Sequence, residues 1–301
     1  MISAELPNLP NNHQVPIYFS TGGARKIAAT EFGEKLWAQG SRAVELSGGV
    51  YASSPQDAVM NLKSKGCAIL IHNYYPIPLE PFVLNLSSAD GSILAKSMEL
   101  ARGAITLSSQ VGAKYYGIHA GFLFDPKPEE LGKRIAANTF TDRQKSFDIF
   151  LESMNELSAF ANNLGIKLLV ENNVLSSENM EAHAGNKLLL VDPYEIEYFL
   201  NICQNVGLLL DLGHLSVSSK SLGFDKFQAL QQLSEYIVGY HASDNNTLSD
   251  QHLELNTDSW FLGKLKKNVE FITLEIHSGS ISEFNNSKAL LLSTLADSYE
   301  V

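Results

Sequence analysis

Side chains that bind divalent metals recur along this chain, and most of them stand at the end of a short apolar run. Imidazole nitrogens and carboxylate oxygens are the usual protein ligands of zinc and related ions. A buried carboxylate needs a partner to offset its desolvation, and a cation is the simplest partner. We therefore predict that residues distant in sequence meet around metal ions. The nine candidate ligands are His72, His119, Glu171, Asp211, His214, His241, Asp250, His252 and Glu275.

The candidate ligands end apolar segments that alternate with longer amphipathic segments. This alternation is typical of repeated strand and helix units with parallel strands. Strands are predicted at Val15 to Ser20, Ala43 to Leu46, Ala68 to His72, Tyr115 to His119, Lys167 to Glu171, Val206 to Asp211, Ile237 to His241 and Phe271 to Glu275. Helices are predicted at Ala24 to Gln39, Pro55 to Lys65, Ile93 to Gln110, Arg143 to Leu164, Tyr194 to Gln204, Phe224 to Tyr236 and Ser259 to Lys267.

Eight such units predict a (β/α)8 TIM barrel that forms a single domain over residues 1–301. Residues 1–13 are expected to be a loose N-terminal segment, and Ser176 to Asn186 a surface loop. Ser54, Asp142 and Asp192 are expected to cap helix starts. Helix stops are predicted at Gly40, Gly66, Gly112, Gly165 and Gly207. In such barrels the active site lies where strands end at the carboxyl face, which is where the candidate ligands stand.

Other side chains are candidates for substrate contact or for no role at the site. His277 follows Glu275 by two residues, the period at which strand side chains share a face. Tyr75 and its neighbour Tyr74 could line the pocket or simply pack over the barrel mouth. Any histidine taken alone is also explained as a hydrogen-bonded structural group, so the prediction rests on the whole set. The histidines at positions 13 and 183 lie in loop-like sequence and are expected to be solvated.

The composition argues against nucleic acid and membrane partners. Twenty-two Lys and Arg against 33 Asp and Glu give a net charge of -11, and an acidic surface repels phosphate backbones and anionic membranes. No apolar segment approaches the ~20 residues that cross a bilayer, and the N-terminus does not resemble a secretory signal. We therefore expect a cytoplasmic protein in which Cys67 and Cys203 are buried free thiols. A homo-oligomer is left open.

At these residues the sequence resembles the xylose-isomerase-like barrel superfamily from Val15 onward. That superfamily includes sugar isomerases and epimerases, inosose dehydratases and apurinic endonucleases of the endonuclease IV type. In the ketose epimerases a single metal is held by residues that match Glu171, Asp211, His241 and Glu275. The resemblance implies that Glu171 and Glu275 also move protons and that His214 contacts substrate.

The wider set of nine resembles the endonuclease IV branch, which binds three zinc ions. The resemblance implies that His72 and His119 bind one ion, with Glu171 bridging to a second ion held by Asp211, His241 and Glu275. It further implies that a third ion is bound by His214, Asp250 and His252. Two segments depart from this branch. Ser47 to Tyr51 lacks the arginine that enters the DNA stack, and Leu253 to Asp258 replaces the usual Gly-x-Gly turn.

Three function classes follow from these residues. We expect metal-assisted isomerisation or epimerisation of a small carbohydrate, with zinc as the preferred ion, up to three ions, and Mn, Mg or Co as alternatives. The alternative is a zinc-dependent endonuclease at abasic DNA, or a related metal-dependent lyase or hydrolase; DNA binding suits the acidic chain poorly. The third class is a metal-dependent binding protein. Ser20 to Gly23 and Ser278 to Ser280 could present backbone N–H groups to phosphate or be ordinary turns.

Overall fold

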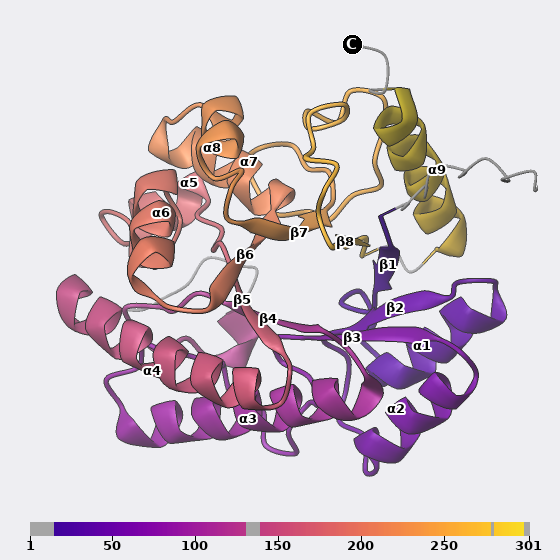
Figure 1. The fold of residues 1–301 in the computed structure, drawn as a ribbon. Helices are drawn as coiled ribbons and strands as arrows, with labels where there is room; N and C mark the ends of the chain where they lie inside the picture. Colours follow the sequence, from indigo (N-terminus) through magenta and orange to yellow (C-terminus); the bar gives the residue numbers. More distant parts are fainter. Residues whose placement is uncertain (1–14, 131–138, 278–279, 298–301) are drawn as a thin grey trace, which may run out of the picture.

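Eight parallel strands close into a barrel in chain order, which confirms the predicted (β/α)8 fold (Figure 1). The computed structural model describes residues 15–130, 139–277 and 280–297, so the predicted loose segment 1–13, with its histidine, lies outside the described residues. β2 to β6 have the predicted bounds, and the other strands differ by one or two residues. The strands are β1 (Ile17–Ser20), β2 (Ala43–Leu46), β3 (Ala68–His72), β4 (Tyr115–His119), β5 (Lys167–Glu171), β6 (Val206–Asp211), β7 (Ile237–Ala242) and β8 (Phe271–Leu274).

Helices cover the outside of the barrel, as a parallel sheet with apolar outer faces requires. Asp142 and Asp192 cap helix starts by accepting backbone N–H groups, and Gly112 ends a helix in the left-handed conformation. The helices are α1 (Ala29–Ala38), α2 (Pro55–Ser64), α3 (Gly91–Val111), α4 (Arg143–Asn163), α5 (Ser177–Ala182), α6 (Pro193–Ile202), α7 (Leu212–Leu222), α8 (Lys226–Gln232) and α9 (Ile281–Asp297).

Some predicted segments were wrong. Ser259 to Lys267 forms turns instead of a helix, and Gly263 within it has a positive φ of 71°. The predicted surface loop from Ser176 to Asn186 contains α5, because the Ser176 hydroxyl accepts from the N–H of Asn179 and starts a helix. Gly207 lies inside β6 and is not a helix stop. Helix α7 was not predicted, since its start continues the apolar run of β6.

The barrel interior is layered, with apolar residues below and the candidate ligands above. Side chains two residues apart on a strand share a face. Leu70, Leu169 and Leu209 therefore point inward, each two residues before a candidate ligand, and they form one buried cluster with Phe271. The strand register also sets the upper layer, because His119 pairs with Glu171 and Asp211 with His241.

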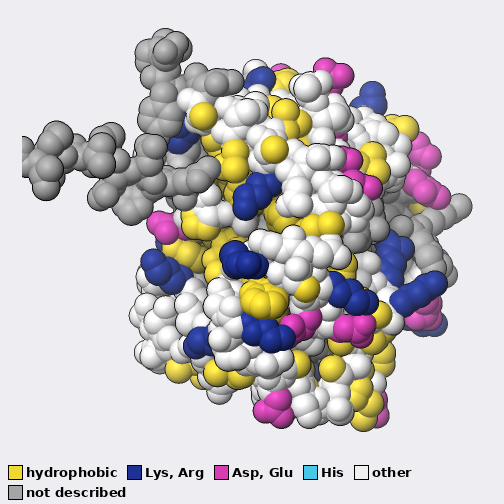
Figure 2. Space-filling view, turned by 90° about the vertical axis from the view of Figure 1, so that its right-hand side faces the viewer, with side chains coloured by type: hydrophobic (Ala, Val, Ile, Leu, Met, Phe, Trp, Pro, Cys, Tyr) yellow, Lys and Arg dark blue, Asp and Glu magenta, His cyan; other side chains and the backbone are white. Residues whose placement is uncertain are grey.

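The two cysteines agree with the prediction made for them. Cys67 and Cys203 are buried and free. Among the described helices, none combines the length and apolar character of a membrane span. On the side of the molecule seen in Figure 2, acidic and basic side chains are interspersed, and no histidine of the described residues is visible. The histidines of interest lie inside the barrel mouth.

Candidate metal centre

The last four strands bring one candidate ligand each to a common point. Glu171, Asp211, His241 and Glu275 are buried, and one ligand atom from each lies within 4.8 Å of the others. Nδ1 of His241 is 3.2 Å from Oε1 of Glu171 and 3.0 Å from Oε2 of Glu275. We call these residues the central group. Their convergence follows from the barrel, because the carboxyl ends of parallel strands meet at one mouth.

Two imidazoles from β3 and β4 approach the same glutamate from the other side. Nε2 of His72 is 3.1 Å from Oε2 of Glu171, and Nε2 of His119 is 3.4 Å from the same oxygen. His72 is buried, while His119 has 28% of its side chain exposed. Glu171 thus directs one oxygen to the central group and the other to this histidine pair, as a bridging carboxylate would.

The third set stands on the loops after β6 and β7. Nε2 of His214 is 3.2 Å from Oδ2 of Asp250, and Nε2 of His252 is 2.8 Å from the same oxygen. Asp211 accepts from the N–H of His214 at 2.6 Å, which caps α7 and fixes His214 in its first turn. Paired backbone hydrogen bonds between Asp244 and Leu253 close the loop that carries the other two residues. We call these three residues the outer group.

The ring orientation of His214 follows from a backbone contact. Nδ1 of His214 lies 2.8 Å from the carbonyl oxygen of Asn172. A carbonyl can only accept, so Nδ1 carries a proton and Nε2, beside Asp250, is the nitrogen that would bind an ion. Metal-ligating histidines commonly donate their second ring N–H to such an acceptor.

Several polar atoms at the centre are buried without a hydrogen bond in the described structure. They are both carboxylate oxygens of Glu171, Oδ2 of Asp211 and Nδ1 of His241. Leaving such groups unpartnered costs free energy, so native proteins rarely bury them without a water, ion or ligand. Carboxylate oxygens and an imidazole nitrogen that converge within 4.8 Å fit a divalent cation.

Comparison with known proteins agrees with this barrel. The family model described as xylose isomerase-like TIM barrel matches residues 35–290. The chain belongs to this family.

Similar proteins align with most of the length of this xylose isomerase-like barrel. It is 23% identical over 243 residues to an uncharacterized protein, MJ1614, of Methanocaldococcus jannaschii, and the match covers 76% of this chain and 82% of that one. A D-tagatose 3-epimerase-like protein has a TM-score of 0.71 at 20% identity, with 94% of this chain and 97% of that chain covered. A xylose isomerase-like barrel from Mycobacterium smegmatis, in complex with magnesium, has a TM-score of 0.65 at 16% identity, with 95% and 98% covered.

The charges of the central group are mutually dependent. Burial alone would lower the pKa of His241, but Glu45, Glu171 and Glu275 raise it well above its ordinary value. Burial opposes ionisation of Glu171 and Glu275, yet the nearby imidazoles hold the pKa of each carboxyl below its ordinary range. Burial raises the pKa of Asp211 to about 6. Protonated imidazole therefore balances the carboxylates when no ion is bound.

The two remaining predicted site residues, His277 and Tyr75, have different surroundings. His277 stacks on His252 with ring centroids 3.7 Å apart, and its Nε2 lies 3.9 Å from Oε1 of Glu275. Burial and the nearby His252 lower the pKa of His277 to about 4, so its ring is neutral at pH 7. Tyr75 is buried with its hydroxyl beside Thr30 of α1, and it is not part of the convergent groups. Substrate contact by either residue stays a prediction.

One histidine was predicted wrongly. His183 is buried, at 7% exposure, instead of solvated. Its ring packs against Phe124 and Phe140, with centroid distances of 5.6 and 5.4 Å. It follows α5, the helix that the sequence analysis treated as loop.

Glu45, a buried carboxylate on β2, was not among the predicted ligands. Glu45 reaches into the barrel, where Oε1 lies 3.0 Å from Nε2 of His241. Its signal was present in the sequence, because a glutamate in the run Ala43 to Leu46 interrupts an otherwise apolar strand. Glu45 does not stand at a strand end as the predicted ligands do, because it precedes the last residue of β2 by one position.

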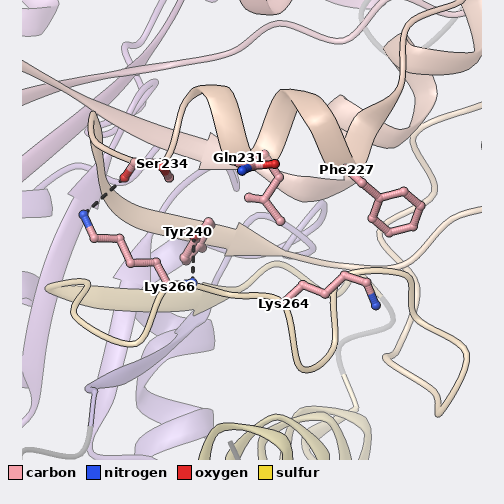
Figure 3. Close-up of a pocket in the computed structure, with 7 residues that line it drawn as sticks. Phe227, Gln231, Ser234, Tyr240, Lys264 and Lys266 are labelled. Carbon is pink, nitrogen blue, oxygen red and sulfur yellow. Dashed lines mark hydrogen bonds between the residues drawn. The ribbon is translucent and has the colours of Figure 1, made fainter. Parts of the chain in front are cut away.

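A separate cavity of about 490 Å³ lies on the outside of the barrel (Figure 3). Phe227 and Gln231 of α8 line it together with Lys264 and Lys266 of the connection to β8. Tyr240 contributes to it because it alternates with His241 on β7 and so faces the opposite side. This cavity contains none of the candidate ligands and is distinct from the metal centre.

Proposed function

We propose that this protein is a divalent-metal-dependent isomerase or epimerase of a small sugar or sugar derivative. The observation that carries the proposal is the central group, in which four buried ligand atoms from β5 to β8 lie within 4.8 Å of one another. The likeness to a D-tagatose 3-epimerase-like protein supports the carbohydrate class. The acidic surface is compatible with it, because a neutral sugar requires no basic patch.

Glu171 and Glu275 are the proposed proton carriers. The ion held by the central group would supply Lewis-acid polarisation of the substrate carbonyl. One glutamate removes the proton from the carbon beside that carbonyl, and the other returns a proton. Both carboxyls have lowered pKa values, so either can act as the base, and the other takes up a proton from solvent before it returns one to carbon. Because the carboxylates are buried, bulk water is kept from the carbanion that forms on the substrate.

Zinc is the proposed ion where histidines dominate the ligands, as in the outer group and around the pair His72 and His119. The central group has three carboxylates and one imidazole, a set that also suits manganese, magnesium or cobalt. The Mycobacterium smegmatis barrel was solved in complex with magnesium, which supports a hard ion as an alternative to zinc in a barrel of this kind. We propose one ion at the central group and two further zinc ions at the other two groups.

The test measures whether carbon-bound protons of the sugar exchange with solvent deuterium. The metal-loaded protein is incubated in deuterated water with a panel of ketohexoses and ketopentoses, and proton NMR follows loss of signal at the carbons beside the carbonyl. We expect deuterium incorporation and a new epimer or isomer with at least one sugar, and neither after chelation. Metal-loaded protein that exchanges no proton on any sugar of the panel would remove the proposal.

Phosphoester hydrolysis at abasic DNA is the second candidate, and one observation favours it. Two of the three groups share Glu171, and together the groups contain nine ligands, the set that the resemblance to the three-zinc endonucleases implies. The net charge of -11 and the lack of Lys or Arg between Ser47 and Ser54 oppose duplex binding. Nicking of an abasic-site duplex by the zinc-loaded protein, absent with an intact duplex, would establish this activity instead.

A further inference from the structure

Glu45 faces the candidate centre from behind one of its ligands. The side chain is 2% exposed, and its oxygens lie 3.0 and 3.2 Å from Nε2 of His241. The hydroxyl of Thr273 donates to Oε2 of Glu45 at 3.1 Å. The ion pairs found among the described residues give this carboxylate no Lys or Arg partner. His241 is thus its principal charge partner.

The two nitrogens of His241 face opposite environments. Nδ1 points at Glu171 and Glu275 in the central group, while Nε2 points at Glu45. An ionised carboxylate only accepts hydrogen bonds, so Nε2 must carry a proton. An ion at the central group would take the place of the proton on Nδ1, so the ring that binds it keeps its proton on Nε2, facing Glu45.

A purely structural role explains Glu45 poorly. Hydrophobic residues of similar volume often stabilise a core as well as a buried ion pair does, because both charges must be desolvated. The neighbouring inward positions on other strands are filled by Leu70 and Leu209, which pack without that cost. The carboxylate at position 45 is better explained by its contact with Nε2 of His241.

We propose that Glu45 is a positioning residue that fixes the tautomer and ring orientation of His241 for metal binding. This inference rests on the metal centre of the proposed function. His214 is oriented by the neutral carbonyl of Asn172, whereas His241 is oriented by the charged carboxylate of Glu45. The negative charge also makes Nδ1 of His241 a stronger electron-pair donor to a metal ion. Loss of such a partner typically costs about 10- to 100-fold in metal affinity.

The test compares metal affinity in Glu45→Gln and the wild type by isothermal titration with zinc and with cobalt. The glutamine amide has no charge and can turn its NH2 toward Nε2, which favours the wrong tautomer. We expect affinity for the central ion to fall about 10- to 100-fold and the visible spectrum of the cobalt protein to change. Glu195→Gln is the matched control, since Glu195 is a partly exposed carboxylate paired with Arg143 away from the centre, and it should leave both readouts unchanged.

A second measurement needs no variant. In the zinc-loaded wild type, nitrogen-15 NMR should show His241 with its proton on Nε2. A proton on Nδ1, or equal affinity and equal spectra for Glu45→Gln and the wild type, would overturn the role of Glu45 while the metal site stands. A wild type that binds no ion would remove the proposed function and this inference together.

Discussion

The two sides of the barrel mouth are built differently. On the side of β5 to β8, every strand delivers a carboxylate or an imidazole to the central group. On the side of β1, the strand ends in Ser20 and continues through Thr21 into two glycines. One side is crowded with charge and the other has small side chains. We infer that the first side binds the ion and the second leaves room for what the ion acts on.

The glycines of the β1 side lie directly against the charged side. A Cβ atom at Gly22 would lie 3.1 Å from Oε1 of Glu275 and 3.2 Å from Nε2 of His277. At Gly23 it would lie 2.9 Å from Cα of His277, which is closer than real Cβ contacts come. The loop after β1 therefore packs on the segment after β8 so closely that a side chain at either glycine would be crowded.

The largest effect is expected from Glu171→Gln, because Glu171 contributes to two groups and is a proposed proton carrier. Removing the charge should lower turnover by ~10²–10⁴-fold through loss of the base alone. Metal content, measured by mass spectrometry of the purified variant, should fall as well. Glu235→Gln, on an exposed residue outside the mouth, should change neither. Full activity of the Glu171 variant would contradict the division between the two sides.

Metal binding should depend steeply on pH. In the ion-free protein, burial opposes protonation, but the carboxylates raise the pKa of His241 and of His214 well above the ordinary value, and that of His252 to about 9. These rings carry protons at pH 7, and an ion must displace them, so affinity rises with pH until about pH 9. Each displaced proton contributes about a tenfold change in affinity per pH unit.

Calorimetry in buffers of different ionisation enthalpy measures this proton release. His119 should release none, because burial lowers its pKa to about 4. Zinc affinity that stays constant between pH 6.5 and pH 9 would show that the imidazoles are not displaced ligands.

A substitution in the outer group should distinguish a protein that uses one metal ion from a protein that uses three. Asp250→Asn removes the carboxylate that contacts both His214 and His252, so one equivalent of zinc should be lost from the three-ion protein. If the central group alone performs sugar chemistry, turnover should change by less than about tenfold, far below the loss of a general base. Metal counting and the exchange assay on the same preparation measure both. Loss of all ions would show that the groups form one interdependent site.

The sequence was sufficient for the barrel and for the residues that converge at its mouth. Each strand from β3 to β7 ends at or within one residue of a candidate ligand, so the topology alone brings those side chains together. The inner contacts were harder to predict. Glu45 precedes the end of its strand, and its meaning depends on a histidine 196 positions later, which no local pattern shows.

Two of the segments predicted wrongly have different physical causes. Helix α7 begins with Leu212 directly after β6, so hydrophobic periodicity changes there without a turn residue between the elements. The segment Ser259 to Lys267 has helical spacing, but the hydroxyl of Ser259 and the amide of Asn256 both bind Asp244, which holds the chain in turns. A long-range side-chain contact therefore decided the second segment, and a single sequence does not display such a contact.

The smallest effect is expected on the β1 side, where Gly22→Ala adds one methyl group. At 3.1 Å from Oε1 of Glu275, that methyl requires a shift of a few tenths of an ångström, which the side chains of Glu275 and His277 can partly absorb. We expect a rise of about threefold in KM with little change in kcat, since removing uniform binding raises KM alone. Gly91→Ala is the control, because nothing lies within 4 Å of a Cβ there. A fall in kcat for Gly22→Ala, with KM unchanged, would place the proton transfer and not the substrate against this glycine.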